Sequence, residues 1–242
     1  MSSLRGLFVT GTDTDVGKTY VSSVILRELI AAGHSVGVSK PACSGAVFET
    51  GEARWPDLDQ LAQAAGISDV DLICRQRFQA PLAPPVAARL EGRQPDLSAM
   101  QENLLAWQSI ADIVVVEGVG GLLCPLTDHD TVADFAAWVE FPLLVVARLG
   151  LGTINHTLLT IEAATRRNLA IAGVILNDAD GLDDTLAGKT NFAELANRTD
   201  VPVLGIVGRG GQSVSLRDQE TPARIDWSEL AGSRKNKAMS PE

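Results

Sequence analysis

The sequence predicts an α/β protein with a single doubly wound, mostly parallel sheet. Two observations carry this prediction. Strand-like segments alternate with helix-like segments, and each strand-like segment is almost wholly apolar, as expected for strands covered on both faces. Glycine-rich and polar stretches follow the strands, and such stretches gather at one edge of an open parallel sheet. The expected strands are 6–10, 36–39, 112–117 (followed by a glycine-rich turn at 118–121), 143–147, 171–176 and 201–207.

Helical periodicity and terminal signals place the remaining elements. Apolar residues recur at helical spacing after residue 18 and stop at Gly33. The other expected helices are 57–66, 86–90, one from Asp96 or Ser98 to about 111, 131–140, and one opening after Gly152 and running to about 167. No linker or repeat interrupts the pattern, so residues 1–232 are expected to form one domain. Residues 233–242 form a polar tail that is expected to be disordered.

Composition narrows the function. The 242 residues carry a formal net charge of −10, which argues against a nucleic-acid partner. The three cysteines are too few and too scattered for a disulfide framework or a zinc site. No uncharged apolar run reaches membrane-spanning length, and the N-terminus has no secretory pattern. We therefore expect a cytoplasmic protein that acts on small molecules and does not bind a membrane.

A phosphate-binding loop lies between the first strand and the first helix. The segment Gly11-Thr12-Asp13-Thr14-Asp15-Val16-Gly17-Lys18-Thr19 leads from strand to helix, so its N–H groups and the helix N-terminus can hold phosphate oxygens. Lys18 would contact the β- and γ-phosphates and Thr19 would offer a hydroxyl to Mg²⁺. Thr12 occupies the usual glycine position and Gly11 stands one residue earlier, so this is a variant Walker A loop. The alternative is an ordinary glycine-containing turn.

Three further charged residues stand where open sheets bind ligands. Lys40 follows the second strand, and a solvated strand end is its alternative reading. Asp57 follows Pro56 and also fits a helix N-cap. Glu117 ends a run of four apolar residues, three of them valines, and could face a metal ion held by the phosphate loop. Its alternative role is a strand-end carboxylate that caps a turn.

Four segments together resemble the dethiobiotin synthetase family. They are Gly11–Thr19, Lys40-Pro41-x-x-Ser44-Gly45, Val116-Glu117-Gly118-x-Gly120-Gly121 and Leu149-Gly150-x-Gly152-Thr153-Ile154-Asn155-His156. The resemblance runs from residue 6 to about 207 and includes the longer phosphate loop. It implies a P-loop cyclo-ligase that uses ATP and Mg²⁺ to carboxylate 7,8-diaminononanoate with CO₂ (or bicarbonate). A carbamate and a carbamic-phosphoric anhydride would precede closure of the ring.

The resemblance also implies roles for individual residues. Lys40 and Lys18 would be catalytic, and the ion would be associated with Thr19, Asp57 and Glu117. The substrate would meet Thr14, Lys40, Ser44 and, across a homodimer interface, Gly152, Thr153, Ile154 and Asn155. The nucleotide would be bound by Asp15, Val16, Gly17, Lys18, Thr19, Tyr20, Asp57, Glu117, Gly118, Val119, Gly120, Asn177 and Asp178.

Some alternatives stay open. Asp59 could replace Asp57 as the acid near the metal, because the preceding loop is variable. Residues 207–211 depart from the proline-containing adenine loop of the family. His156 could act as a base, although a packing or interface role is preferred. A partition-type ATPase that binds a macromolecule shares the loop style but usually carries an extra lysine near the loop start. The synthetases of cobalamin synthesis carry an added glutaminase domain, for which this chain is too short.

Overall fold

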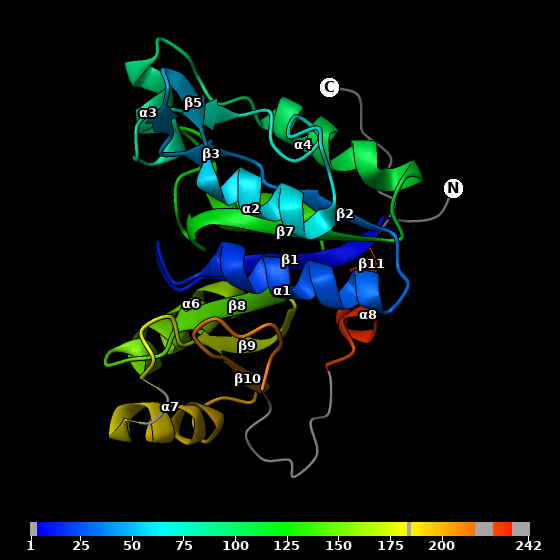
Figure 1. Cartoon of the computed structure of the whole chain (residues 1–242). Coiled ribbons are helices and arrows are strands. Elements are labelled where there is room, and N and C mark those ends of the chain that lie inside the picture. The colour runs from blue at the N-terminus through cyan, green and yellow to red at the C-terminus, as the bar shows by residue number, and fades with distance from the viewer. Residues whose placement is uncertain (1–3, 183–184, 216–224, 234–242) are drawn as a thin grey trace.

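The computed structural model describes residues 4–182, 185–215 and 225–233. Figure 1 shows one central sheet with helices on both faces. The strands are β1 (Arg5–Gly11), β2 (Val36–Ser39), β3 (Cys43–Ser44), β4 (Val47–Glu49), β5 (Glu52–Arg54), β6 (Arg77–Phe78), β7 (Ile113–Gly121), β8 (Leu143–Arg148), β9 (Ile171–Asn177), β10 (Val203–Val207) and β11 (Gly232–Ser233). The helices are α1 (Lys18–Ala31), α2 (Pro56–Ala65), α3 (Pro84–Leu90), α4 (Leu97–Leu105), η1 (Ala106–Ser109), α5 (Val132–Val139), α6 (Thr153–Thr165), α7 (Leu186–Ala196) and α8 (Trp227–Leu230).

The central sheet has the strand order β10-β9-β8-β1-β7-β2, and these neighbours are all parallel. The prediction of a mostly parallel α/β sheet is therefore confirmed. β1 lies between β7 and β8, so the phosphate loop that follows it emerges from the middle of the sheet. Parallel strands end at one edge, and this edge collects the segments that the sequence marked as functional.

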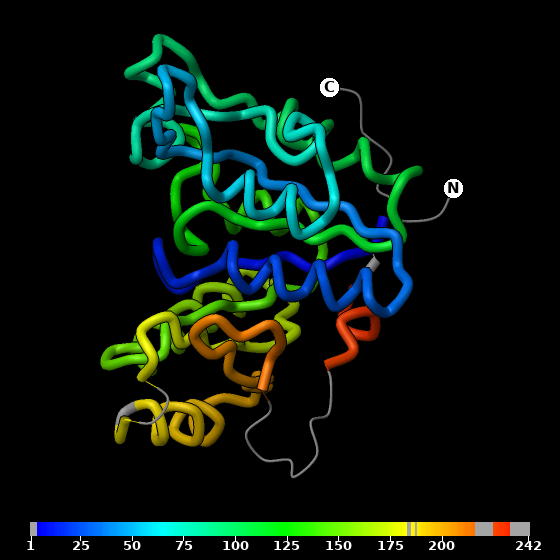
Figure 2. Tube along the Cα trace, viewed as in Figure 1, coloured from blue at the N-terminus to red at the C-terminus, as the bar shows by residue number. Residues whose placement is uncertain are grey.

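Apolar side chains fill the space on both faces of the sheet. On one face, α1 and α2 pack on alternate residues of β1 and β7 such as Leu7 and Val115. On the other, α4 and α5 cover the residues that point the opposite way, among them Phe8 and Val116. The alternation follows from the two-residue period of a strand. Figure 2 traces α1 and α2 side by side in front of the sheet.

Several elements differ from the sequence prediction. α7 was not predicted, because Leu186 is 81% exposed and the helix shows little apolar periodicity; Thr185 caps it by accepting from the N–H of Gly188. The helix expected from 96 to about 111 is capped by the side chain of Asp96 and changes to a 3-10 turn at Ala106. β7 continues to Gly121 where a glycine-rich turn was expected after Glu117, and the last large strand begins at 203 rather than 201. The N-cap role for Asp57 is wrong, since α2 begins one residue earlier, at Pro56.

The C-terminal segment 225–233 is tied to the start of the sheet. Trp227 is 2% exposed and its indole N–H donates to Glu28 of α1. The Arg5 guanidinium donates to the carbonyls of Ser228 and Ala231, and Ser233 pairs with Arg5 in β11. The prediction of a disordered tail is therefore wrong for Ser233, and residues 234–242 of that tail lie outside the residues that the structure describes. Because this segment shares the central sheet, we propose that the whole unit is one domain.

Candidate active site

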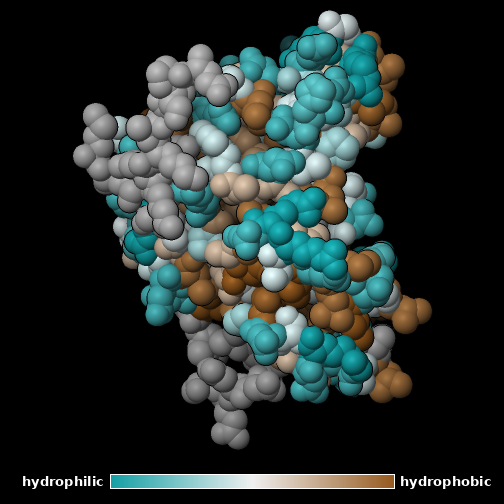
Figure 3. Space-filling view, turned by 180° about the vertical axis from the view of Figure 1, so that it is seen from behind, coloured by the Kyte–Doolittle hydropathy of each residue, from teal (hydrophilic) through white to brown (hydrophobic). Residues whose placement is uncertain are grey.

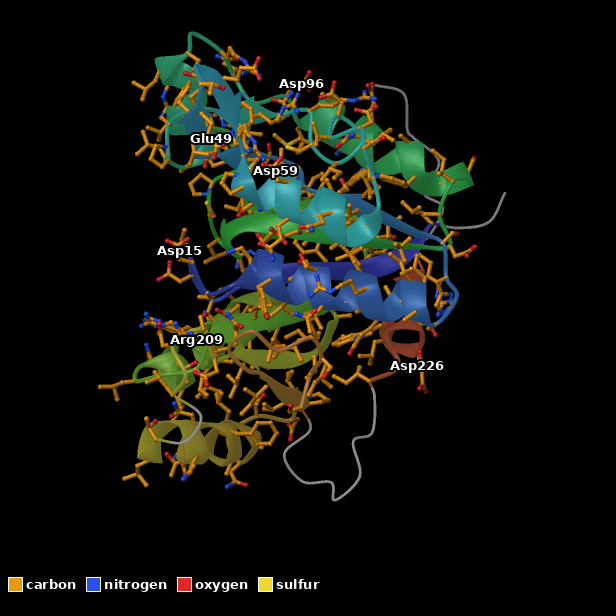
Figure 4. The ribbon with its side chains drawn as sticks, in the orientation of Figure 1. Asp15, Glu49, Asp59, Asp96, Arg209 and Asp226 are labelled. Carbon is orange, nitrogen blue, oxygen red and sulfur yellow. The ribbon has the colours of Figure 1, made fainter. Side chains whose placement is uncertain are left out.

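The phosphate loop closes a tight turn between β1 and α1. Gly17 precedes the helix with φ +87°, a left-handed conformation that favours glycine. Asp15 also has positive φ and is exposed at the tip of the loop, at the edge where the parallel strands end (Figure 4). Lys18 turns back over the loop, and its ammonium donates to the carbonyl of Asp13 at 3.1 Å. Burial lowers the pKa of Lys18 from its ordinary value, with Glu117 acting in the opposite direction.

The end of β9 supports the loop from behind. The amide of Asn177 donates to the carbonyl of Val16 at 3.0 Å. A Cβ on Gly17 would lie 1.9 Å from that amide nitrogen, so only glycine allows this approach. Asp178 is 2% exposed and its carboxylate accepts from the N–H of Leu182. Both side chains therefore take part in the local structure around the loop.

Lys40 lies between two carboxylates at the centre of the site. Its ammonium is 2.5 Å from Glu117 Oε1 and 2.8 Å from Asp57 Oδ2. Thr19 donates its hydroxyl to the same Glu117 oxygen at 2.8 Å. Lys40 is 2% exposed and Glu117 is fully buried, whereas about half of the Asp57 side chain reaches solvent. The alternative readings of Lys40 and Glu117 as solvated or turn-capping strand ends are therefore wrong.

The carboxylates keep Lys40 charged. Burial alone would lower its pKa, but Glu117 and Asp57 outweigh burial and raise the pKa above the ordinary lysine value. Burial would raise the pKa of Asp57, but Lys40 outweighs it and the pKa is lowered. At neutral pH the site therefore holds a protonated Lys40 ammonium beside an ionised Asp57 carboxylate. Asp59, the other candidate acid, pairs instead with Arg54, 2.8 Å away on the surface.

A cavity of about 730 Å³ joins the phosphate loop to the Lys40 cluster. Of the predicted site residues, it is lined by Thr14, Asp15, Gly17, Lys18, Thr19, Tyr20, Lys40, Ser44, Asp57, Val119 and Gly120. The remaining predicted site residues do not line the cavity. They are buried beneath its lining (Glu117, Val16 and Gly118) or lie behind the phosphate loop (Asn177 and Asp178). Phosphate-loop, strand-end and α2 residues thus share one chamber.

The segment Gly152–Asn155 stands apart from this cavity. It forms the start of α6, and among the described residues it lines neither the main cavity nor a neighbouring one of about 410 Å³. His156, the next residue, is exposed and lines the neighbouring cavity with Leu159 and Leu123. The structure of one chain therefore does not bring the predicted carboxylate turn into the same chamber as Lys40.

The main cavity also has an apolar wall that sequence reasoning missed. Trp55 and Pro81 line it with Leu82 and Cys43. The Trp55 indole donates to the carbonyl of Phe78 at 3.0 Å, which fixes the ring. The sequence Trp55-Pro56 just before Asp57 could have indicated this wall, because it places a large apolar ring at the start of a helix that also carries a predicted site residue. Burial raises the pKa of the Cys43 thiol to about 12, so it stays protonated.

The oxygen donors fit a hard divalent cation. Glu117 Oε2 is buried and has no hydrogen-bond partner within the part of the chain that the structure describes. Its other oxygen meets the Thr19 hydroxyl, and the Asp57 carboxylate reaches the same Lys40 ammonium. Mg²⁺ is typically held by one or two carboxylates together with substrate phosphates. These three residues could hold the ion beside a phosphate bound by the loop.

The fold and the cavity define a P-loop α/β nucleotide-binding protein. The model of the AAA domain family matches residues 5–214. The solved structures of the signal recognition particle receptor FtsY from Elizabethkingia anophelis in complex with GDP and of the septum site-determining protein MinD complexed with Mg-ADP from Pyrococcus horikoshii OT3 are similar in fold. The FtsY structure has a TM-score of 0.54 and 18% identity, and the match covers 95% of this chain and 63% of FtsY. The MinD structure has a TM-score of 0.50 and 16% identity, and the match covers 85% of this chain and 81% of MinD.

Curated relatives identify the family within this class. The ATP-dependent dethiobiotin synthetase BioD of Anaeromyxobacter sp. (strain K) is 50% identical over 81% of this chain and 86% of its own length. The same enzyme of Anoxybacillus flavithermus is 37% identical over 93% and 99%. The chain belongs to the ATP-dependent dethiobiotin synthetase family. The predicted family and the predicted class, an ATP-dependent cyclo-ligase of biotin synthesis, are confirmed.

None of the helices that the structure describes is long and apolar enough to span a membrane.

Proposed function

We propose that the chain uses MgATP to carboxylate 7,8-diaminononanoate with CO₂ and to close the ureido ring of dethiobiotin. One amine takes up CO₂ to give a carbamate, and a carbamate oxygen then attacks the γ-phosphorus of ATP, releasing ADP. The second amine attacks the resulting carbamic-phosphoric anhydride, releasing phosphate. The observation that carries this proposal is Lys40, a buried ammonium on the wall of the cavity that the phosphate loop also lines.

Lys40 suits a reaction whose intermediates are anionic. Its raised pKa keeps it protonated, so it serves as a fixed charge and not as a general base. A buried cation beside a developing negative charge is worth more than one in water, because little solvent screens it. We assign Lys40 to the carbamate and the transferring phosphoryl group, with Thr14 and Ser44 of the same cavity beside the diamine.

The phosphate loop supplies the remaining positive charge. The N–H groups at the start of α1 and the Lys18 ammonium would hold the phosphates of ATP. We assign Thr19, Asp57 and Glu117 to Mg²⁺, and the other nucleotide contacts to the loop, to Glu117–Gly120 and to Asn177 and Asp178. The ion would neutralise phosphate charge during transfer. No side chain has to act as a nucleophile, since the reacting atoms belong to the substrates.

We further propose that the protein is a homodimer of the cytoplasm. The turn Gly152–Asn155, which begins α6 away from the main cavity, could meet the substrate carboxylate only from a second copy. Figure 3 shows a broad apolar area on the reverse face. Leu123 and Leu159, which line the smaller cavity beside α6, are 48% and 55% exposed. Apolar surface of this kind supports a protein interface.

Labelled bicarbonate tests the reaction directly. Purified protein should fix label into an acid-stable product only when the diamine, ATP and Mg²⁺ are all present. Lys40→Met should still bind ATP but lose at least about 100-fold in turnover, as expected when one transition-state charge contact is lost. Turnover that depends on DNA or a protein partner, and not on the diamine, would favour a partition-type ATPase instead.

Two neighbouring aspartates test the metal site. Asp57→Asn should raise the Mg²⁺ concentration needed for half-maximal activity by about tenfold, in line with the loss of a metal-site side chain. Asp59→Asn is the matched control, because it removes a carboxylate that pairs with Arg54 on the surface. An equal effect of both substitutions would contradict the assignment of Asp57.

A further inference from the structure

Tyr20 joins the phosphate loop to a distant part of the chain. It is the third residue of α1 and stands two residues after Lys18. Its hydroxyl donates to the carbonyl of Gly211 at 2.7 Å, across 191 positions of sequence. The Tyr20 side chain also lines the main cavity. One side chain thus contacts both the proposed nucleotide chamber and the loop that follows β10.

The loop after β10 contains a glycine-rich turn at residues 208–211, and the chain beyond it folds back antiparallel to the end of β10. The N–H of Gly211 donates to the carbonyl of Gly208 at 2.8 Å, and Gly210 has φ +70°. Beyond it, Ile206 and Ser215 exchange two backbone hydrogen bonds as an antiparallel bridge. Glycine-rich backbone loses much conformational freedom when it is ordered. A side-chain tether at Gly211 therefore helps to set the position of this turn.

The turn is also connected to the end of β9. The N–H of Asp178 donates to the carbonyl of Val207, and Asn177 donates to the phosphate loop at Val16. The loop after β10 lies beside the first turn of α1 in Figure 2, and Arg209 of this loop stands at the strand-end edge in Figure 4. The Asn177 bond therefore joins the end of β9 to the phosphate loop, and the Tyr20 bond joins the turn after β10 to the first turn of α1.

We propose that Tyr20 is a positioning residue for the nucleoside part of ATP. This inference rests on the proposed function, in which the phosphate loop holds the phosphates. Lys40 and Ser44 occupy the substrate side of the chamber, so the nucleoside lies toward the ends of β9 and β10. Backbone groups of the glycine turn can then read the edge of the base, provided that the turn stays at a fixed distance from the phosphates. The Tyr20 hydroxyl sets that distance.

The test compares a nucleotide with a bare polyphosphate. Tyr20→Phe removes only the hydroxyl, and calorimetry measures binding of MgATP and of magnesium tripolyphosphate. The dissociation constant of MgATP should rise about three- to tenfold, the range for one lost neutral hydrogen bond, whereas that of tripolyphosphate should change less than about twofold. In turnover, the KM for ATP should rise similarly while kcat at saturating ATP stays within about twofold.

Ser35→Ala is the matched control. It also removes a hydroxyl hydrogen bond, to Asp112 beside the starts of β2 and β7, and should leave both ligands unaffected. Equal weakening of ATP and tripolyphosphate by Tyr20→Phe, or no weakening of either, would overturn the role of Tyr20. Wild-type protein that binds no ATP would overturn the proposed function itself, so the two failures are distinguishable.

Discussion

Removal of the Lys40 ammonium should destabilise the protein far more than removal of a surface cation. Lys40→Met keeps the length and volume of the side chain but leaves Glu117 without its cation. Glu117 is fully buried, and its Oε1 would keep only the Thr19 hydroxyl. The loss should therefore come mainly from an uncompensated buried charge.

The magnitude follows from the burial of each partner. Breaking a buried ion pair by removing one side typically costs about 3–5 kcal/mol. The Asp57 side chain is half exposed, so its share is at most about 1 kcal/mol. We expect the free energy of unfolding of Lys40→Met to fall by about 3–5 kcal/mol at pH 7. This is a large part of the stability of an ordinary domain.

Urea unfolding without ligand measures this loss, and a double-mutant cycle isolates its cause. The variant Lys40→Met with Glu117→Gln should recover most of the lost stability, because no buried charge is left unpaired. Arg54→Met is the control, since it breaks exposed pairs with Glu49 and Asp59 and should cost less than about 1 kcal/mol. A single variant as stable as Arg54→Met, or a double variant no more stable than Lys40→Met, would refute the reasoning.

Three further changes test other parts of the structure. Gly17→Ala should weaken ATP binding by at least about tenfold in calorimetry, because its Cβ displaces Asn177 and its φ is strained; unchanged affinity would contradict this. Asp57 has a lowered pKa, so it stabilises the fold above its unfolded value of about 3.9, and this contribution disappears as pH falls through the folded pKa. Asp57→Asn should therefore flatten the fall of Tm between about pH 5 and 2, and an unaltered slope would argue against it. Trp227→Ala should cost about 3–5 kcal/mol in urea unfolding because a buried ring is lost, and a cost below about 1 kcal/mol would show that the C-terminal segment is dispensable.

The sequence predicted the central sheet because its strands are locally unambiguous. The run Ile113–Val116 is apolar without interruption, and only a strand covered on both faces needs such a run. α7 escaped detection for the opposite reason. Its first residue, Leu186, faces solvent, and its buried face mixes Gly188 and Asn191 with Phe192 and Leu195, so the apolar periodicity on which sequence reasoning depends is weak. A helix whose buried face mixes polar and apolar residues is harder to predict from sequence than a strand that is wholly apolar.

The phosphate loop was predictable because all of its parts are adjacent in sequence. β1, the loop and α1 follow each other without interruption from Arg5 to Ala31, and local geometry alone assembles them. The link from Tyr20 to Gly211 could not be predicted in this way. It depends on the position of β10 at the edge of the sheet. The acceptor is a backbone carbonyl of a glycine turn, so no side chain in the sequence indicates that Tyr20 bonds there. Long-range contacts through backbone carbonyls leave no residue-type signal.

The ion cluster around Lys40 shows where sequence reasoning stops. Each member could be placed at an element end, but the sequence did not reveal that β7 lies between β1 and β2. In the sheet, Ser39 is paired with Val116, so the next residues, Lys40 and Glu117, emerge side by side at the same edge. Asp57 then completes the cluster from the first turn of α2. A change of one residue in that register would turn the Lys40 side chain to the other face of the sheet and separate it from Glu117. Strand order and register, more than the residue types, therefore decide whether these three charges form one site.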